Sequence, residues 1–207
     1  MMKITNEKLT SLLSEIIPNP RCELIYNHDY ELLISTVLSA QSTDKRVNEV
    51  TRTLYKKSLL EISKMSLLEI EKIIRPVGSY HKKAVFVKSI AEHLLKDWNG
   101  IVPNDRDYLE SLSGVGRKTC NVVLSELFNV PAIAVDTHVF RVSKRLGLSK
   151  TSDDVLKVEN KLKKFLKKED WGRVHLQLVL FGRYYCTSKN PKCDNCLLKD
   201  YCKQQKK

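Results

Sequence analysis

The sequence predicts an all-α protein. Apolar residues recur at the three- and four-residue spacing of a helix face in several separate segments, and no segment shows the strict alternation of a strand. The connections between these segments are short and carry proline or glycine, as in residues 75–79 and 99–104. No segment repeats at a period of about 20–50 residues, which argues against a repeat architecture.

Six segments carry the helical pattern. The first stops at Pro18-Asn19-Pro20, because proline cannot continue a helix. The second is almost continuously apolar, so we expect it to be buried. The last has one apolar stripe, and lysines occupy the rest of its surface. The six segments cover residues 9–17, 30–38, 67–74, 84–95, 122–128 and 155–166.

The positive charge is concentrated in the last third of the chain. The formal net charge is +12 at pH 7. Residues 1–140 hold 18 Lys and Arg against 17 Asp and Glu, whereas residues 141–207 hold 18 against 7. This asymmetry favours a polyanionic partner such as nucleic acid. Lysines on solvated helix faces would give the same counts, so charge alone does not decide the partner.

The N-terminal residues give no sign of a targeting segment. Residues 1–8 lack an apolar run and include an acid, so we expect neither a signal peptide nor a transit peptide. No stretch approaches the roughly 18 apolar residues of a membrane span, and we expect no membrane partner. We therefore expect a cytoplasmic protein whose six cysteines stay reduced rather than forming disulfides.

Residues 112–119 lie between two helical patterns. Asn104 or Asp105 is placed to cap the first helix, and the second is expected to run from about Arg117 to Phe128. The sequence therefore predicts a helical hairpin with a tight turn.

Two glycines, Gly114 and Gly116, give this turn its chemical interest. They permit positive φ angles and leave no side chain between the backbone N–H groups and an anion. Those groups open a helix, whose dipole adds partial positive charge, so a DNA phosphate would fit there. A helix-to-helix turn can also need glycine for structural reasons alone. A nucleotide-triphosphate loop is excluded, because no strand precedes the glycines and their spacing differs.

Residues 112–119, Leu-Ser-Gly-Val-Gly-Arg-Lys-Thr, resemble the helix-hairpin-helix of the endonuclease III family of DNA glycosylases. Further motifs follow in the order and spacing of that family, so the resemblance covers nearly the whole chain. They are Leu38-Ser-Ala-Gln-Ser-Thr-Asp44, Val135-Asp-Thr-His-Val-Phe-Arg-Val142, Gly182-Arg-Tyr184 and a group of four cysteines.

The resemblance implies two helical lobes with the DNA cleft between them. Residues 22–133 would form a six-helix domain that contains the hairpin. Residues 1–21 and 134–207 would form the iron–sulfur cluster domain.

Two residues are candidates for catalysis. Lys118 stands in the first turn of the second hairpin helix, and a lysine amine can attack an electrophilic carbon to form a Schiff base. Asp136 precedes a helical run and suits an N-cap, from which its carboxylate could stabilise positive charge on a sugar or an ammonium. A solvated lysine and a simple cap are the structural alternatives. The resemblance makes Lys118 the nucleophile and Asp136 the catalytic aspartate, and favours a structural or DNA-contact role for His138 over general base.

Four cysteines fall within 17 residues, with spacing x6, x2 and x5. In a reducing compartment such a group indicates a metal site, and spacing alone favours zinc. The resemblance instead implies a [4Fe–4S] cluster with one thiolate on each iron. Cys22 and Cys120 lie apart, and we expect them to be small core residues. The four expected ligands are Cys186, Cys193, Cys196 and Cys202.

The resemblance also implies a set of DNA contacts. Gln41 matches the residue that enters the gap left by a flipped base, although a helix-end glutamine needs no such role. Ser79 replaces a larger apolar residue that is frequent in the family, and Ser113 replaces a proline. Both departures bear on substrate range. The expected contacts are Gln41, Ser79, Tyr80, His81, Gly114, Val115, Gly116, Arg117, Thr119, Lys189 and Lys192.

We therefore expect a base-excision repair enzyme that removes oxidised pyrimidines from double-stranded DNA. It would cleave the abasic site by β-elimination through a lysine Schiff base. Its partner is DNA with damaged bases or abasic sites, its location is the nucleoid, and we expect a monomer. The alternatives are a monofunctional mismatch glycosylase, a non-catalytic helix-hairpin-helix DNA-binding protein and a zinc protein unrelated to repair.

Overall fold

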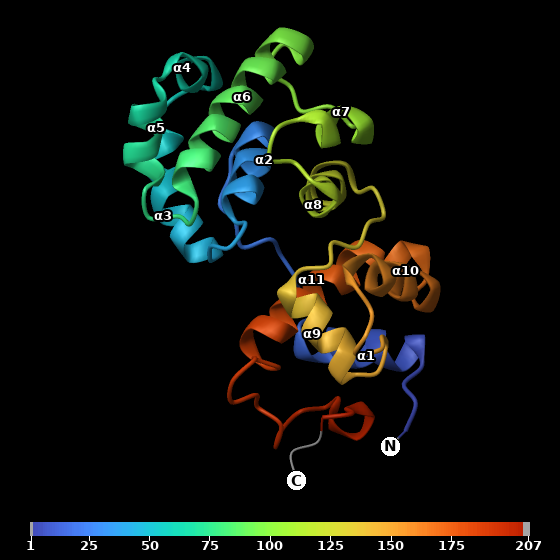
Figure 1. Ribbon diagram of the computed structural model, residues 1–207. Helices are drawn as coiled ribbons and strands as arrows, with labels where there is room; N and C mark the ends of the chain where they lie inside the picture. The colour runs from blue at the N-terminus through green and yellow to red at the C-terminus, as the bar shows by residue number, and fades with distance from the viewer. Residues whose placement is uncertain (1, 205–207) are drawn as a thin grey trace. The chain divides into compact units, whose positions relative to one another are not determined.

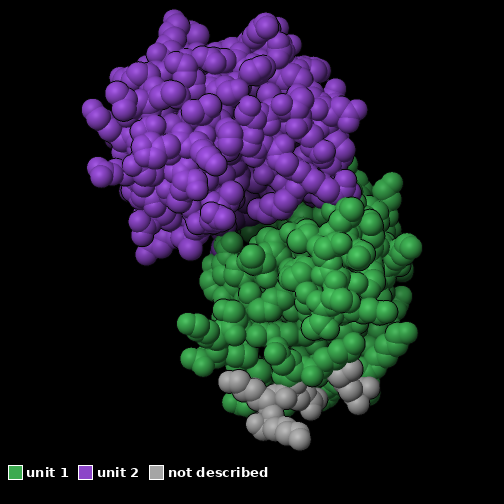
Figure 2. Space-filling model, viewed as in Figure 1, with its two compact units in different colours: residues 1–21, 129–207 green, residues 22–128 purple. Residues whose placement is uncertain are grey.

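The computed structural model describes residues 2–204, which form eleven α-helices and two 3₁₀ helices and, within that range, no strand (Figure 1). The prediction of an all-α fold is confirmed. The chain divides into two compact units, residues 22–128 and residues 1–21 with 129–207 (Figure 2). No helix of the described residues is long and apolar enough to cross a membrane.

The unit of residues 22–128 is built around α2 (Asp29–Leu38), which contacts α3, α6 and α8. Every residue from Glu31 to Leu38 is buried, as the continuous apolar run predicts. The Tyr55 hydroxyl lies 2.7 Å from the Glu31 carbonyl and 2.6 Å from Ser35 Oγ, so a tyrosine provides hydrogen-bond partners for these buried polar groups of α2. The other helices of the unit are α3 (Asp44–Leu54), α4 (Leu59–Lys64), α5 (Leu67–Ile74), α6 (Tyr80–Trp98), α7 (Arg106–Ser111) and α8 (Arg117–Phe128).

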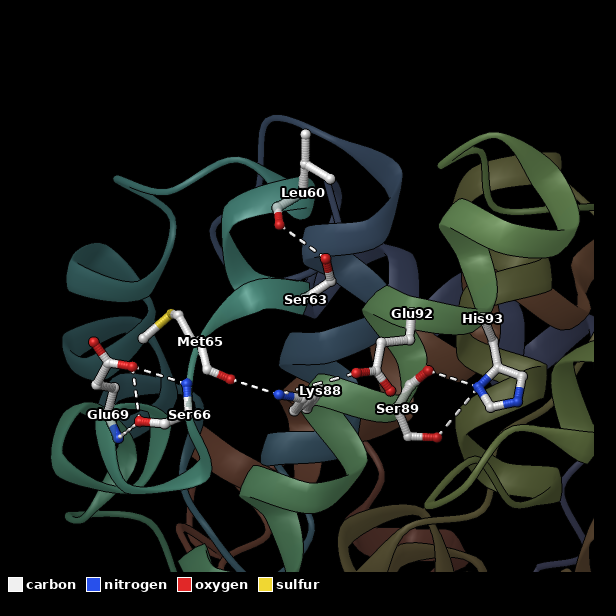
Figure 3. A network of polar contacts seen from close by, with 9 residues as sticks. All are labelled: Leu60, Ser63, Met65, Ser66, Glu69, Lys88, Ser89, Glu92 and His93. Atoms are coloured by element: carbon white, nitrogen blue, oxygen red, sulfur yellow. Dashed lines mark hydrogen bonds and ion pairs between the residues drawn. The ribbon is translucent and has the colours of Figure 1, made fainter.

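Helices α4 and α5 are short and begin with a capping box, in which serine and glutamate exchange hydrogen bonds across the first turn. In α5 the Ser66 N–H donates to Glu69 Oε2 at 2.8 Å, and Ser66 Oγ accepts from the Glu69 N–H at 3.3 Å (Figure 3). Lys88 of α6 donates to the Met65 carbonyl at 2.8 Å, where α4 ends. The Lys88 contact therefore ties the junction between α4 and α5 to α6.

The second unit joins α1 to the C-terminal part of the chain. Its apolar core includes Leu9, Leu13, Val142, Leu162 and Phe181, which come from four helices. Those helices are α1 (Asn6–Ile16), α9 (Thr137–Arg145), α10 (Val155–Phe165) and α11 (Trp171–Tyr184), with the short 3₁₀ helices η1 (Lys168–Asp170) and η2 (Lys199–Tyr201).

Three details differ from the sequence expectation. The compact units divide after Phe128, and Ile133 is buried in the core of the second unit, whereas the sequence analysis assigns residues 129–133 to the hairpin domain. Residues 22–128 contain seven helices rather than six, because α4 and α5 are separate helices with caps of their own. Val155 begins α10 but is 50% exposed, so the buried stripe of that helix starts at Val158.

The link between α1 and α11 generates a stability prediction. Gln177 donates from Nε2 to the Ile17 carbonyl at 3.0 Å and to Ser14 Oγ at 3.2 Å. We expect Gln177→Ala to lower the free energy of unfolding by about 1–3 kcal/mol, because the groups it binds at the end of α1 lose a buried partner. Arg173→Ala is the control: Arg173 is more exposed, although it also binds Ser14, and we expect a change within about 0.5 kcal/mol. Urea unfolding followed by circular dichroism measures both, and equal losses would contradict the assignment.

Candidate functional site

The predicted hairpin consists of α7, a turn at residues 112–116 and α8. Asp105 caps α7 by accepting the Tyr108 N–H at 3.0 Å, which settles the choice between Asn104 and Asp105. Helix α8 begins at Arg117, as expected. Inside the turn, the Val115 N–H donates to the Leu112 carbonyl at 3.0 Å.

That hydrogen bond corrects one expected contact. The Val115 N–H is used inside the turn, and its side chain is only 4% exposed. Val115 therefore anchors the hairpin and offers neither its side chain nor its amide to an anion. Thr119 is 8% exposed, so its side chain also faces the protein interior and only its backbone remains as a possible contact.

The two glycines of the turn are required for different reasons. Gly114 has φ +84°, and a Cβ there would lie 2.5 Å from Cδ2 of Phe86. Gly114 is thus demanded by both backbone conformation and packing. A Cβ on Gly116 would meet no atom within 4 Å. No packing within the chain explains Gly116, but a side chain there would stand in the path of a ligand that approaches the start of α8.

Lys118 lies in the first turn of α8, and its side chain is exposed. Two residues further on, Cys120 is fully buried, and burial raises the pKa of its thiol to about 11. Cys120 is the core residue we expected, whereas Cys22 is only half-buried. The amine is thus the accessible nucleophile of this turn, and the thiol is withdrawn from solvent.

An arginine that we did not predict braces the hairpin. Arg106 of α7 donates from Nη2 to Asn121 Oδ1 of α8 at 2.8 Å and from Nη1 to Glu110 at 2.7 Å. Asn121 is 1% exposed, so this contact ties the two helices together behind the turn. In the sequence, the one sign of this contact is that Asn121 lies within an otherwise apolar stretch of α8.

Asp136 is the N-cap of α9, as predicted. Its Oδ1 accepts the His138 N–H at 2.9 Å and the Val139 N–H at 2.8 Å. Both bonds go to the same oxygen, so capping does not use Oδ2. His138 Nδ1 lies 3.2 Å from Arg141 Nη2, and this engagement fits a structural role for the imidazole.

The glycine of the Gly182-Arg-Tyr184 motif is explained by a close approach of α9 and α11. A Cβ on Gly182 would lie 2.8 Å from the Cβ of His138. Arg141 Nη2 donates to the Gly182 carbonyl at 2.7 Å, and Arg141 Nε donates to the Cys186 carbonyl at 3.1 Å. Arg141 therefore orders the end of α11 and the first cysteine from the helix that Asp136 caps.

The four C-terminal cysteines lie in the loop that follows α11. Arg145 Nη1 donates to Cys186 Sγ at 3.2 Å and to the Thr187 carbonyl at 2.7 Å. Burial raises the pKa of Cys196 and of Cys202, and the negative charges of the other cysteines raise both further. Four thiolates held this close need a compensating cation.

The four cysteines have the chemistry of a metal centre. Thiolates are soft ligands that suit zinc or an iron–sulfur cluster, and four of them within one loop can hold either.

Lys189 and Lys192 are exposed on the same loop, as predicted for residues that meet phosphates. Lys192 Nζ lies 5.3 Å from the centroid of the Tyr185 ring, which orients that side chain without removing it from solvent. Thr187 Oγ1 donates to the Lys189 carbonyl at 2.6 Å, and this bond fixes the backbone between Thr187 and Lys189.

Gln41 and Ser79 lie in two adjacent loops of residues 22–128. Both are exposed, and both have left-handed backbone conformations, with φ of 56° and 57°. The Gly78 N–H donates to Ser42 Oγ at 3.1 Å, so the loops are tied to each other. The neighbouring rings of Tyr80 and His81 lie 4.0 Å apart between centroids, and His81 Nδ1 is 3.0 Å from Glu71 Oε2.

The residue that sequence reasoning missed here is Lys83. It is 4% exposed, and its ammonium donates to the Leu38 carbonyl at 2.8 Å and to the Ala40 carbonyl at 2.6 Å. The available signal was a lysine in the first turn of a long helix, one residue before its buried apolar face begins. A surface lysine gives the same signal.

Comparison with known proteins agrees with this geometry. Residues 34–168 match the HhH-GPD superfamily of base excision DNA repair proteins, and residues 186–202 match the iron–sulfur binding domain of endonuclease III. The cofactor of the four cysteines is therefore a [4Fe–4S] cluster, not zinc.

Individual relatives match the chain over nearly its full length. It is 44% identical to endonuclease III of Bacillus subtilis, over 94% of this chain and 90% of that one. Identity to the Haemophilus influenzae endonuclease III is 41%, over 100% and 99%. A solved endonuclease III trapped as a covalent intermediate with DNA superposes with a TM-score of 0.91 at 44% identity, covering 97% of this chain and 96% of that one.

A thermostable thymine-DNA glycosylase, at 23% identity and a TM-score of 0.77, shows the same fold. The family match and the two full-length relatives go further than fold, because they agree with the hairpin and the cysteine loop described above. The chain belongs to the endonuclease III family, within the HhH-GPD superfamily of base excision DNA repair proteins.

Proposed function

We propose that this protein removes oxidised pyrimidines from double-stranded DNA and cleaves the resulting abasic site, with Lys118 as nucleophile and Asp136 as its charged partner. One observation carries the proposal: an exposed lysine stands in the first turn of α8, two residues after a glycine that no packing requires. The similarity to an endonuclease III trapped covalently on DNA supports it.

The chemistry follows from an amine and a carboxylate. The Lys118 amine attacks C1′ of the damaged nucleotide, and the bond from C1′ to the base breaks as the base leaves with the bonding electrons. Opening of the sugar ring gives an imine. Loss of a proton from C2′ then expels the 3′ phosphate by β-elimination, and hydrolysis releases the lysine. The Asp136 carboxylate stabilises the positive charge that develops on the sugar and the amine.

The remaining expected residues would hold the DNA. We propose that the open amides near Gly114 and Gly116, with Arg117, bind one phosphate, and that Lys189 and Lys192 bind others. Gln41 and the residues Ser79, Tyr80 and His81 would occupy the space that the flipped base leaves.

The cluster has a supporting role in this proposal. The four cysteines hold the loop of residues 186–202 in one conformation when the cluster is bound, and that loop presents Lys189 and Lys192. We propose that the protein acts as a monomer on the nucleoid, in the cytoplasm.

Borohydride trapping tests the nucleophile and the reaction together. On a duplex with one thymine glycol, the wild type should give a covalent adduct, because borohydride reduces an imine to a stable amine. Lys118→Gln should give none while binding the duplex within about threefold of wild type. Asp136→Asn keeps the cap and removes the charge, and we expect adduct formation at least about a hundredfold slower.

The outcomes of this experiment separate the alternatives. Base release without an adduct would identify a monofunctional glycosylase. Binding without base release, on this duplex and on one with an abasic site, would identify a non-catalytic DNA-binding protein. An adduct with Lys118→Gln would assign the nucleophile to another residue.

The two hairpin glycines offer a matched pair. Gly116→Ala has room for its methyl group, so we expect unchanged stability and a loss of DNA affinity of about tenfold. Gly114→Ala combines a positive φ with a clash against Phe86, so we expect a lower melting temperature. Thermal unfolding and fluorescence anisotropy with a labelled duplex measure the two effects. Full affinity for Gly116→Ala would remove the hairpin from the DNA contacts.

Iron content tests the cluster ligands. Cys193→Ser should lose most of its iron and its broad visible absorption, because a serine hydroxyl is a poor ligand for iron at neutral pH. Cys22→Ser lies outside the loop and should keep both. Metal analysis of the purified proteins makes the comparison. Full iron in Cys193→Ser would exclude that residue as a ligand.

A further inference from the structure

Lys83 is a buried lysine that the reaction proposed above does not use. Lysine is almost never fully buried unless its charge is paired or hydrogen-bonded. Here the ammonium is bound by two backbone carbonyls, of Leu38 and Ala40, at 2.8 and 2.6 Å. Burial lowers the pKa of this side chain, because desolvation disfavours its charged form.

The two carbonyls lie where α2 ends and the loop to α3 begins. Leu38 is the last residue of α2, and the C-terminal carbonyls of a helix carry partial negative charge that a cation stabilises. The Ala40 carbonyl belongs to the peptide that joins Ala40 to Gln41. A hydrogen bond to that oxygen fixes the orientation of the peptide and, with it, the direction in which Gln41 leaves the helix.

The Gln41 backbone needs such support. Its φ of 56° lies in the left-handed region, which costs a non-glycine residue about 1 kcal/mol or more. On the other side of Gln41, Ser42 Oγ accepts the Gly78 N–H at 3.1 Å. Gln41 is thus bracketed by two contacts, and both come from the segment of residues 78–83.

The same segment carries the second DNA loop. Ser79, also left-handed, lies between Gly78 and Lys83, so the two bonds to the first loop flank the second loop as well. A shift of one loop must therefore move the other. The exposed residues at both tips, Gln41 and Ser79, are held in one fixed relation.

We propose that Lys83 is a positioning residue for base extrusion: its ammonium holds Gln41 in the strained conformation that fills the duplex and keeps it in register with Ser79. The inference rests on the proposed function, because it assumes that Gln41 and Ser79 enter the duplex. It predicts that Lys83 matters only when a stacked base must be replaced. A lysine that merely joins α2 to α6 would affect every substrate alike.

Lys83→Met tests this, because methionine fills similar space without the ammonium. Excision of thymine glycol from duplex DNA in single turnover should slow by at least about tenfold. Cleavage of a single-stranded oligonucleotide that carries an abasic site should stay within about twofold, because that substrate has no stack to fill. Equal losses on both substrates, or no loss on the duplex, would overturn the inference.

Lys88→Met is the matched control. Lys88 lies on the same helix, is partly buried and also donates to a backbone carbonyl, that of Met65 at 2.8 Å, but its partner is at the end of α4 rather than in either loop (Figure 3). We expect both rates of Lys88→Met to match the wild type. A loss equal to that of Lys83→Met would show that removal of any carbonyl-bound lysine from α6 has this effect.

A double-mutant cycle adds a readout that a structural role would not move. If Lys83 acts through Gln41, then Lys83→Met should slow duplex excision little further in a Gln41→Ala background. If the double variant slows duplex excision by the product of the two single effects, the two residues act independently and the proposal is contradicted. Should Lys83→Met fail to fold, Ser42→Ala removes the other contact between the loops, the bond from the Gly78 N–H. We expect Ser42→Ala to slow excision on the duplex selectively. If its rate on the duplex shows no selective loss, the proposal is also overturned. If the wild-type protein neither excises the base nor forms a borohydride adduct, the proposed function itself is refuted.

Discussion

The ends of helices leave backbone N–H and C=O groups without partners inside the helix, and the functional parts of this protein are built on how those groups are satisfied. Asp136 accepts two N–H groups at the start of α9, and Lys83 donates to two carbonyls where α2 ends. Arg145 binds the carbonyls that follow α11. The start of α8 follows Gly116, whose Cβ position faces open space. Where a side chain binds the end of a helix, that contact also positions the residues around it.

The positive side chains of the C-terminal third fall into two groups, those that bind other groups of the protein and those that are exposed to solvent. The sequence shows an excess of positive residues after residue 140, and that excess suggested a polyanion. Arg141 and Arg145 donate most of their hydrogen bonds to backbone carbonyls and to the thiol of Cys186. Lys161 and Lys163 pair with Asp153 and Glu159. A charge count thus overstates the cationic surface that is open to a polyanion, and Lys189 and Lys192 are among the lysines that stay exposed.

The sequence predicts structure well where a residue type has one role that depends only on its neighbours in the chain. Periodicity located the helices, the glycine pair located the hairpin turn, and Asp136 was recognised as a cap. It was a poor guide to contacts between segments that lie far apart in the chain. The burial of Lys83 depends on carbonyls more than forty residues away, and the bond from Arg106 to Asn121 depends on how α7 and α8 pack. The Val115 amide was misjudged because its partner, Leu112, is set by the turn conformation rather than by composition.

The deep burial of Cys120 gives the hairpin a chemical selectivity. An abasic site presents an aldehyde, and aldehydes add thiolates as readily as amines. A thiol in the same turn as Lys118 could capture the opened sugar in an unproductive adduct. The fully buried Cys120, with its pKa raised to about 11, holds its proton and stays out of reach. The helix that presents the Lys118 amine thereby withholds the thiol of its first turn from an aldehyde in solution.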